Sequence, residues 1–583
     1  MTEGVEITGV AEYPPERSIK LNGPPGTGKT TQLLERLTSL LNDGVDVEDV
    51  TFVTYRTQMA HEFLHRLYAR GHISQDEVFD PTDSESRTTN FGTIHAVCNR
   101  QTSYAEVVTD SDRADFIETE YNAEYEASAG PWDDEGVNET GVGELLFDAY
   151  QWCVENDTHS FPKSPNYMEL SDRVISPPSF ADFDEAWRQY KAAGNEDGDP
   201  LQDFTGMLRE VDVRGLSPSG EVLIVDEYHD MTPIMAGIVE MWMENFETVI
   251  VGGDPLQAIY TYKGADPSFF TDLDLPEVLL DRTYRVPSRV WEYAKEVIKH
   301  DPPDITPDAG GGEVRPVRAD PHRVCEVYGE ESTMLLARTQ SQLHDLRQSL
   351  DAHGYIYRSQ DEIGGWNNSR KLMALFNSLQ KLEGVRPMDH VNPHTGQAGL
   401  AHYDEEAGES AKHPGSVTLD GYEATALIDM TYADHLAGTK TEIRSWASAK
   451  PEVDGGELAD RVEPSFWTAM TRGPESVEKL LAYGPKDKLK AAMERYDEPL
   501  GNIETAPVPD LLTIHASKGR EADTVALYDG VPAAVQRNLR DGERQKEAES
   551  RVWYVGCTRA AKELLVVRDH FDYVDPYLPG TNF

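Results

Sequence analysis

Hydrophobic positions near the N-terminus change from a strand-like to a helix-like spacing around one glycine-rich segment. The stretch SIKL (18–21) has β-type composition and precedes GPPGTGKT (23–30). In the segment TTQLLERLTSLL (30–41), leucines recur three and four residues apart, so they mark one face of a helix. The pattern therefore predicts a strand, a loop and an amphipathic helix in succession.

Two later apolar runs have the composition of buried strands. Val222–Val225 reads VLIV, and residues 249–253 read VIVGG. Strands without polar alternation are typical of parallel sheets that are covered on both faces. Each run ends in polar residues, Asp226–Glu227 after the first and Asp254 after the second. Ligands of open α/β sheets bind at the carboxyl ends of the strands, so these positions are candidates for chemistry.

The glycine-rich loop matches the phosphate-binding pattern G-x-x-x-x-G-K-[ST] in the required strand–loop–helix context. Glycines let backbone N–H groups approach phosphate oxygens, and the helix N-terminus adds partial positive charge. Lys29 is expected to reach the β- and γ-phosphates, and the Thr30 hydroxyl is expected to ligate Mg²⁺. A glycine/proline turn before an ordinary helix is the alternative. The predicted nucleotide-binding residues are Gly23, Pro24, Pro25, Gly26, Thr27, Gly28, Lys29, Thr30 and Thr31.

The segment IVDEYHDMTP (224–233) supplies the carboxylates that a phosphate loop requires. Asp226 is predicted to hold Mg²⁺, and Glu227 is predicted to polarise the attacking water. An isolated Asp-Glu pair after an apolar run is also common as an acidic helix cap. The presence of the phosphate loop favours the catalytic interpretation.

Charge is the strongest global signal. The chain has 104 acidic and 53 basic residues, a net charge of −51. A folded protein with so many carboxylates fits a salt-rich cytoplasm, where screening weakens self-repulsion. The alternative explanations for the acidic surface are binding of basic partners and plain solubility. We expect a halophilic host, an archaeon or its virus or plasmid.

The four cysteines, Cys98, Cys153, Cys325 and Cys557, lie far apart and are expected to be buried thiols in a reducing compartment. No apolar stretch approaches the roughly 20 residues that span a bilayer, and no signal segment begins the chain. We therefore expect a cytoplasmic protein with no membrane partner.

Further segments follow in an order that resembles the superfamily 1 helicases of the UvrD/Rep/PcrA type. After the phosphate loop come VTYRTQMAHEFLHRL, GTIHAVC, DEYHD, GDPLQAIY, TYR, LLARTQSQLHDLRQSLDAHGYIYR, TIHASKGRE and YVGCTRA. The phosphate loop also occurs in Upf-type enzymes of the same superfamily. The segments GTIHAVC, TIHASKGRE and YVGCTRA are similar to the UvrD branch.

This resemblance implies an α/β fold with two RecA-like P-loop NTPase domains that contain parallel sheets, each interrupted by an insertion. ATP would lie between the two domains. The implied division is 1–98 with 201–281 for domain 1A, 99–200 for insertion 1B, 282–382 with 505–583 for domain 2A, and 383–504 for insertion 2B.

The resemblance also implies roles for single residues. Arg285 and Arg559 would act as arginine fingers on the γ-phosphate, and Gln257 would sense it. Glu521 would contact the nucleotide ribose. A surface salt bridge is the alternative for each arginine. Position 229 is His where the family usually has Gln, and no glutamine precedes Gln32, so an adenine-reading Q motif is not recognisable.

Single-stranded nucleic acid is gripped by aromatic side chains on which bases stack, together with contacts to the backbone. The resemblance implies stacking by Tyr55, Tyr260 and Tyr262. It implies that Thr54, Thr93 and His95 line the phosphate track. A core or sheet-face position is the alternative for each tyrosine.

The expected function is an ATP-dependent DNA helicase or translocase that uses Mg²⁺ and moves 3′→5′ on single-stranded DNA and at single-strand/duplex junctions. Repair, recombination and replication are all compatible processes. We expect a monomer when purified, and the sequence does not identify a protein partner. An RNA or RNA:DNA helicase and a non-unwinding, nucleotide-gated strand-clearing protein are the alternatives.

Overall fold

The computed structural model of the 583-residue chain describes most of its length. The described residues are 14, 17–79, 86–102, 106–125, 141–165, 167–174, 176–194, 198–298, 302–308, 310–329, 332–359, 369–385, 390–391, 398–399, 414–472, 486–502, 505–540 and 542–580. Within these ranges no helix combines the length and the apolar character that crossing a membrane requires. All four cysteines are buried thiols, as expected.

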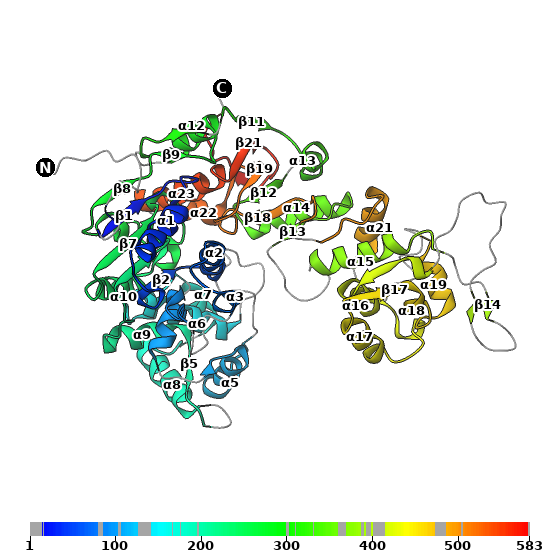
Figure 1. The fold of residues 1–583 in the computed structure, drawn as a ribbon, viewed down its shortest axis with the longest axis horizontal. Coiled ribbons are helices and arrows are strands. Elements are labelled where there is room, and N and C mark those ends of the chain that lie inside the picture. The colour runs from blue at the N-terminus through cyan, green and yellow to red at the C-terminus, as the bar shows by residue number, and fades with distance from the viewer. Residues whose placement is uncertain are drawn as a thin grey trace. The chain divides into compact units, whose positions relative to one another are not determined.

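The chain divides into two compact units, each built on a six-stranded sheet (Figure 1). The first unit comprises Met1–Val314, Pro532–Lys562 and Leu578–Phe583, and the second comprises Arg315–Val531 and Glu563–Tyr577.

The sheet of the first unit has the strand order β3-β2-β6-β7-β1-β8. All of its pairings are parallel. The strands are β3 (Phe91–Thr93), β2 (Val50–Thr54), β6 (Val222–Val225), β7 (Thr248–Gly253), β1 (Ile19–Asn22) and β8 (Glu277–Leu279). Because β6, β7 and β1 are neighbours, the loops that follow them meet at one edge of the sheet. The α/β fold with parallel sheets is confirmed.

Alternate residues of the central strands enter two different cores. Leu223 and Val225 of β6 belong to the core on one face, and Val222 and Ile224 belong to the core on the other. Successive side chains of a strand point to opposite faces, so a sheet covered on both sides needs apolar residues at every position. This requirement explains the uninterrupted VLIV run.

Helix α1 (Lys29–Asn42) covers one face of this sheet (Figure 1). Leu33, Leu34, Leu37 and Leu40 are buried in the core that also contains strand β1. Burying a leucine side chain stabilises the fold by roughly 1.5–3 kcal/mol. The helical face predicted from the leucine spacing is therefore the buried one, and it fixes the start of α1 beside the sheet edge.

The opposite face is covered by a larger core that extends into the expected insertion 1B. Its helices include α4 (Ile94–Gln101), α6 (Val142–Glu155), α8 (Phe180–Ala193), α9 (Phe204–Arg214) and α10 (Pro233–Met243). Phe116, Phe147, Phe183 and Trp187 form its aromatic centre.

Segments from the later part of the chain also pack within the first unit. Helix α23 (Glu543–Cys557) lies against α12 (Ser288–Val297), where Trp291 and Tyr554 meet edge to face at 6.1 Å. The first unit thus contains 282–314 and 532–562, which the resemblance assigns to domain 2A. The four-part domain division stays a prediction.

The second sheet has the order β11-β21-β19-β12-β18-β13. These strands are β11 (Glu313–Val317), β21 (Ala560–Val567), β19 (Ala522–Tyr528), β12 (Thr333–Ala337), β18 (Asp510–Thr513) and β13 (Arg358–Ser359). Pairings of β12 with β18 and β19, and of β13 with β18, are parallel.

A separate core in the second unit joins helices from residues 369–508. It includes α15 (Ser369–Leu382), α16 (Gly421–Met430), α17 (Lys440–Ser448), α19 (Pro464–Met470) and α21 (Lys486–Arg495). Trp467 is fully buried at its centre. The described helices of the expected insertion 2B therefore share one hydrophobic core with α15, which belongs to the expected domain 2A.

Candidate functional site

The phosphate loop leaves β1 at the sheet edge and is tied to the neighbouring strand. The Gly23 N–H donates to the carbonyl of Gly253 at the end of β7 (2.9 Å). Gly26 and Gly28 have φ of +75° and +79°, a region that L side chains rarely adopt. A Cβ at Gly26 would also lie 2.6 Å from Cβ of Arg285, so no larger residue fits there.

Lys29 and Thr30, the first residues of α1, reach the carboxylates that follow β6. The Lys29 ammonium donates to Oε1 of Glu227 (2.7 Å) and lies 3.3 Å from Oδ1 of Asp226. The Thr30 hydroxyl donates to Oδ2 of Asp226 (2.9 Å). Burial alone would lower the pKa of Lys29, but attraction to Glu227 and Asp226 outweighs it and holds the pKa above its usual value. The structure thus brings together four of the predicted residues.

The Thr30–Asp226 pair has the chemistry of a Mg²⁺ site. Mg²⁺ prefers hard oxygen ligands and is usually bound by one or two protein groups together with phosphate oxygens and waters. Asp226 is fully buried. Burial raises the pKa of its carboxyl group, an effect that the positive charge of Lys29 opposes. The donor set therefore fits the ion.

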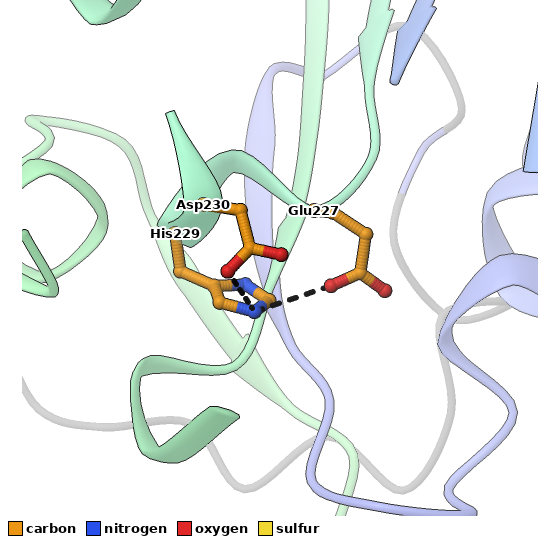
Figure 2. A group of neighbouring side chains, drawn as sticks. All are labelled: Glu227, His229 and Asp230. Carbon is orange, nitrogen blue, oxygen red and sulfur yellow. Dashed lines mark ion pairs between the residues drawn. The ribbon is translucent and has the colours of Figure 1, made fainter. Parts of the chain in front are cut away.

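Glu227 has a strained backbone. Its φ of 57° and ψ of 37° lie in the left-handed region, which is uncommon for a residue with a side chain. Such strain is kept where the surrounding structure determines it, often at functional sites. Figure 2 shows that the Glu227 carboxylate faces the ring of His229, with Asp230 beside it. The left-handed backbone at Glu227 therefore directs its carboxylate toward His229.

Gln257 and Arg559 form a second set of polar contacts, anchored after β7. The Gln257 amide donates to Oδ2 of Asp254 (2.7 Å), and its Oε1 accepts from the Arg559 guanidinium (3.1 Å). Burial raises the pKa of Asp254 to about 6, which the hydrogen bond from Gln257 opposes. Burial also lowers the pKa of Arg559 to about 9, and repulsion from Arg285 contributes to the decrease. A buried guanidinium, that of Arg559, therefore lies near a second cation, the partly buried Arg285.

Residues 283–285 pack directly on the phosphate loop. The Thr283 hydroxyl donates to the carbonyl of Pro25 (2.7 Å), and the Tyr284 N–H donates to the carbonyl of Gly26 (2.9 Å). These bonds bring Arg285 beside the loop. The Tyr284 side chain is 65% exposed. It is a candidate surface for a nucleotide base, which sequence reasoning missed although the segment TYR contains it.

The tyrosines expected to stack on bases are gathered in one cluster. Tyr55 and Tyr260 stack with their ring centroids 5.6 Å apart, and Tyr262 meets Tyr260 edge to face at 6.2 Å. The Arg56 guanidinium donates to the Tyr260 hydroxyl, and the Lys263 ammonium lies 5.5 Å from the centre of the Tyr260 ring. Tyr260 is 7% exposed, so a base would have to displace a neighbouring side chain to reach its face.

Helix α6 holds the chain just beyond these tyrosines. The Trp152 indole N–H donates to the carbonyl of Tyr262 (3.0 Å), and the Asn156 amide donates to the carbonyl of Lys263 (2.9 Å). Gly264 has a φ of +107°, and a Cβ there would lie 2.0 Å from Asn156 Oδ1. The C-terminal end of α6, in the expected insertion 1B, therefore fixes residues 262–264 next to the tyrosine cluster.

The residues expected along the phosphate track have different surroundings. Thr54 is fully buried at the end of β2, so it is not accessible to a ligand in this conformation. Thr93 caps α4 by accepting from the Ala96 N–H (3.2 Å). Burial lowers the pKa of His95 to about 4, and the charge of Lys263 lowers it further. The His95 ring meets Phe204 edge to face at 5.7 Å.

Comparison with known proteins identifies the family. The model of the UvrD/REP helicase N-terminal domain matches residues 8–165 and 208–275, and the model of the UvrD-like helicase C-terminal domain matches residues 489–569. Together the two models cover more than half of the chain. It belongs to the UvrD/Rep helicase family.

Three relatives show how far this similarity extends. The ATP-dependent DNA helicase PcrA of Bacillus subtilis is 24% identical over 58% of this chain and 54% of its own length. The ATP-dependent DNA helicase UvrD2 of Mycobacterium tuberculosis is 23% identical over 83% of this chain and 75% of its own length. DNA helicase IV of Escherichia coli is 32% identical over 20% of this chain. The chain thus spans about half of PcrA and three quarters of UvrD2.

Within this UvrD/Rep-type chain, the predicted residues of the first unit fall into two groups. The phosphate loop, Asp226, Glu227, Gln257, Arg285 and Arg559 surround the carboxyl edge of the sheet. The second group is the tyrosine cluster, in which Tyr260 and Tyr262 follow Gln257 along the chain and Tyr55 packs on Tyr260. Glu521 is exposed and lies in the second unit, immediately before β19, so its contact with ribose stays a prediction.

Sequence reasoning missed a second exposed aromatic residue besides Tyr284. Phe204 is 52% exposed at the start of α9 and contacts His95. The only sequence signal was an aromatic residue directly after a polar pair, as in LQDF. Its ring is available for stacking without rearrangement, unlike that of Tyr260.

Proposed function

We propose that this chain is an ATP-dependent DNA helicase or translocase that moves 3′→5′ on single-stranded DNA. One observation carries the proposal. A single segment, 254–264, begins with the Asp254–Gln257 contacts beside the phosphate loop and ends with the tyrosine cluster held by α6. A nucleotide-dependent movement of Gln257 is therefore transmitted over a few residues to the candidate base-stacking side chains.

The geometry supports a set of proposed catalytic roles. Lys29 exchanges its carboxylate partners for phosphate oxygens when ATP binds, which frees the Glu227 carboxylate to accept a proton from the attacking water. Thr30 and Asp226 would hold Mg²⁺, which when bound neutralises charge on the phosphates. Arg559 and Arg285 offer guanidinium groups to the γ-phosphate. Tyr284 offers an exposed ring to the base, and Glu521 a carboxylate to the ribose.

The DNA-binding roles rest on the aromatic groups. Tyr55, Tyr260, Tyr262 and Phe204 offer faces on which bases can stack, a mode that does not depend on sequence. In molar salt the Debye length is about 3 Å, so stacking carries more of the affinity than general attraction to phosphates. His95 is neutral at pH 7 and acts as a hydrogen-bonding group rather than as a cation. The salt-rich host stays a prediction from the charge.

The deciding experiment measures ATP hydrolysis and strand displacement in roughly molar KCl. The substrates are duplexes with 3′ tails or 5′ tails, made of DNA or RNA. Hydrolysis stimulated by DNA, with displacement from 3′-tailed DNA, is the expected result. Stimulation by RNA alone or displacement only from 5′ tails contradicts the proposal, and stimulation without displacement indicates a translocase.

A matched pair of variants tests the catalytic assignment. Glu227→Gln removes the proton acceptor and is expected to slow hydrolysis about 100-fold or more while the protein still binds ATP. Glu247→Gln makes the same chemical change at an exposed position of the first unit and is expected to hydrolyse ATP at the parent rate. Equal rates for both variants would remove Glu227 from its catalytic role.

A further inference from the structure

His229 lies between the proposed catalytic base and the start of segment 254–264. Its side chain is fully buried. The Asp254 backbone N–H donates to Nδ1 of the ring (2.9 Å). On the other side, Nε2 lies 3.2 Å from Oε2 of Glu227 and 3.6 Å from Oδ1 of Asp230 (Figure 2). The imidazole thus spans the gap between the ends of β6 and β7.

The contact with Asp254 determines where the ring carries its proton. A nitrogen that accepts a hydrogen bond from a backbone N–H holds a lone pair and no hydrogen. In a neutral imidazole the single hydrogen is then on the other nitrogen. Nε2 therefore carries an N–H that faces the two carboxylates. His229 acts as a donor to Glu227 and an acceptor from Asp254.

The same three side chains have the geometry of a small metal cluster. Glu227, His229 and Asp230 each offer an atom within 4.8 Å of the others. A metal would need the lone pair of Nε2, but the bond from Asp254 places the proton on that nitrogen. The Lys29 ammonium, 2.7 Å from Glu227, adds a positive charge that repels a cation. The hydrogen-bonding role is therefore favoured over a metal site.

We propose that His229 is a positioning residue that fixes the Glu227 carboxylate and links it to the nucleotide-sensing segment. This inference rests on the proposed function, because it assigns Glu227 the role of base. Lys29 holds Oε1 of Glu227 and His229 faces Oε2, so the carboxylate is held from both sides. When Lys29 turns to the phosphates, His229 still holds the carboxylate.

The link extends to the γ-phosphate sensor through Asp254. The Asp254 N–H is bound by His229, and its carboxylate accepts from the Gln257 amide (2.7 Å). A shift of Gln257 on contact with the γ-phosphate therefore pulls on the same residue that orients the base through His229. Because Asp254 contacts both His229 and Gln257, the position of the base is coupled to the state of the segment that carries Tyr260.

Three substitutions separate positioning from simple packing. Glutamine carries an acceptor and a donor on one carbon, like the two nitrogens of the ring, so His229→Gln can make both contacts. His229→Leu fills similar space and makes neither. His229→Asn keeps a polar amide, but its side chain is too short to reach both partners at once.

The measurement is DNA-stimulated hydrolysis by the full chain in molar KCl, with affinity for a non-hydrolysable ATP analogue measured separately. His229→Leu is expected to lower kcat about 10- to 100-fold, as expected for a lost hydrogen bond to a charged group. Its affinity for the analogue should stay within about 3-fold of the parent, because ground-state binding is not affected. His229→Gln is expected to restore most of the rate, and His229→Asn to fall between the two.

Two further readouts distinguish positioning from a structural role. In a Glu227→Gln background, His229→Leu should cause little additional loss, because its effect acts through the missing carboxylate. Nitrogen NMR of the parent with labelled histidine should show His229 neutral, with its proton on Nε2. Thermal unfolding of each variant verifies folding, and His229→Gln and His229→Asn still test the proposal if His229→Leu does not fold.

The possible failures can be told apart. A parent protein without ATP hydrolysis refutes the proposed function. If the parent hydrolyses ATP, the positioning role is refuted by a His229→Leu variant with the parent kcat, by a His229→Gln variant as slow as His229→Leu, or by fully additive losses with Glu227→Gln. A proton on Nδ1 of His229 refutes it independently of activity.

Discussion

Replacing Arg559 with methionine should stabilise the nucleotide-free protein while nearly abolishing hydrolysis. Arg559 is 1% exposed, and burial, with repulsion from Arg285, lowers its pKa to about 9. A basic group whose pKa is lower in the folded than in the unfolded protein destabilises the fold while it is charged. The penalty is therefore complete at pH 7 and decreases only above about pH 9.

The size of the effect follows from the structure. At about 1.4 kcal/mol per pH unit, the lowered pKa corresponds to a cost of about 5 kcal/mol. Arg559 also donates to Val555, Gln257 and Thr558, and three such bonds offset the cost by about 3 kcal/mol. Arg559→Met keeps the length of the side chain and removes both terms, so the net gain is about 2 kcal/mol.

The assay is thermal unfolding of the nucleotide-free protein at pH 7 in molar KCl. For a unit of roughly 350 residues, a gain of about 2 kcal/mol corresponds to a Tm about 3 °C higher. The exposed Arg537, in α22 (Ala533–Leu539), provides the control, because Arg537→Met should leave the Tm unchanged. Hydrolysis by Arg559→Met is expected to fall by about 10³-fold, as for loss of an arginine finger.

The reasoning is refuted if Arg559→Met lowers the Tm while Arg537→Met does not. Such a result would mean that the hydrogen bonds of Arg559 outweigh the cost of its buried charge. Unchanged hydrolysis would separately refute its proposed contact with the γ-phosphate. The expected combination, a more stable and less active protein, is typical of residues whose unfavourable burial is retained for function.

Three further predictions concern the tyrosine cluster and one ion pair. Tyr260→Ala should weaken binding of single-stranded DNA about 5- to 150-fold, measured by fluorescence anisotropy, because stacking contributes about 1–3 kcal/mol per base, and equal affinity would remove Tyr260 from the interface. Asn156→Ala should weaken DNA binding about 3- to 10-fold, since it loses the bond that fixes Lys263, whereas unchanged binding would show that α6 does not order the segment. Arg87→Ala should lower the Tm by about 1–2 °C at pH 7. Burial would raise the pKa of Glu77, but the hydrogen bond and charge of Arg87, together with bonds from Ser74, lower it to about 2. That loss should shrink as the pH falls from 4.5 towards 2 and Glu77 takes up its proton in the folded state, and a loss independent of pH would refute the pairing.

The fold near the phosphate loop could be predicted largely from local pattern. The spacing of Leu33, Leu34, Leu37 and Leu40 identified the buried face of α1, and the VLIV run identified β6 with its correct bounds. Both signals arise because the period of a helix or strand determines which side chains share a face. The functional pairing of Lys29 with Asp226 and Glu227 came from the motifs and from the family resemblance.

The side chains that contact the site residues could not be predicted, because they come from segments far apart in the sequence. Asp254 meets His229 only because β7 lies beside β6, and the bond from Asn156 to Lys263 joins residues 107 positions apart. The exposure of Tyr284 and Phe204, and the complete burial of Thr54, likewise depend on what packs around them.

The sequence by itself determined the elements next to the phosphate loop, the loop itself and the family, because these are encoded in short spacings and in the order of motifs. Only the tertiary structure decided that the His229 ring faces Glu227, that Tyr260 is covered by Tyr55, and that Arg559 is buried near Arg285. The physical reason is that hydrogen-bond direction, burial and pKa depend on neighbours, and neighbours far apart in sequence are determined by sheet order and core packing.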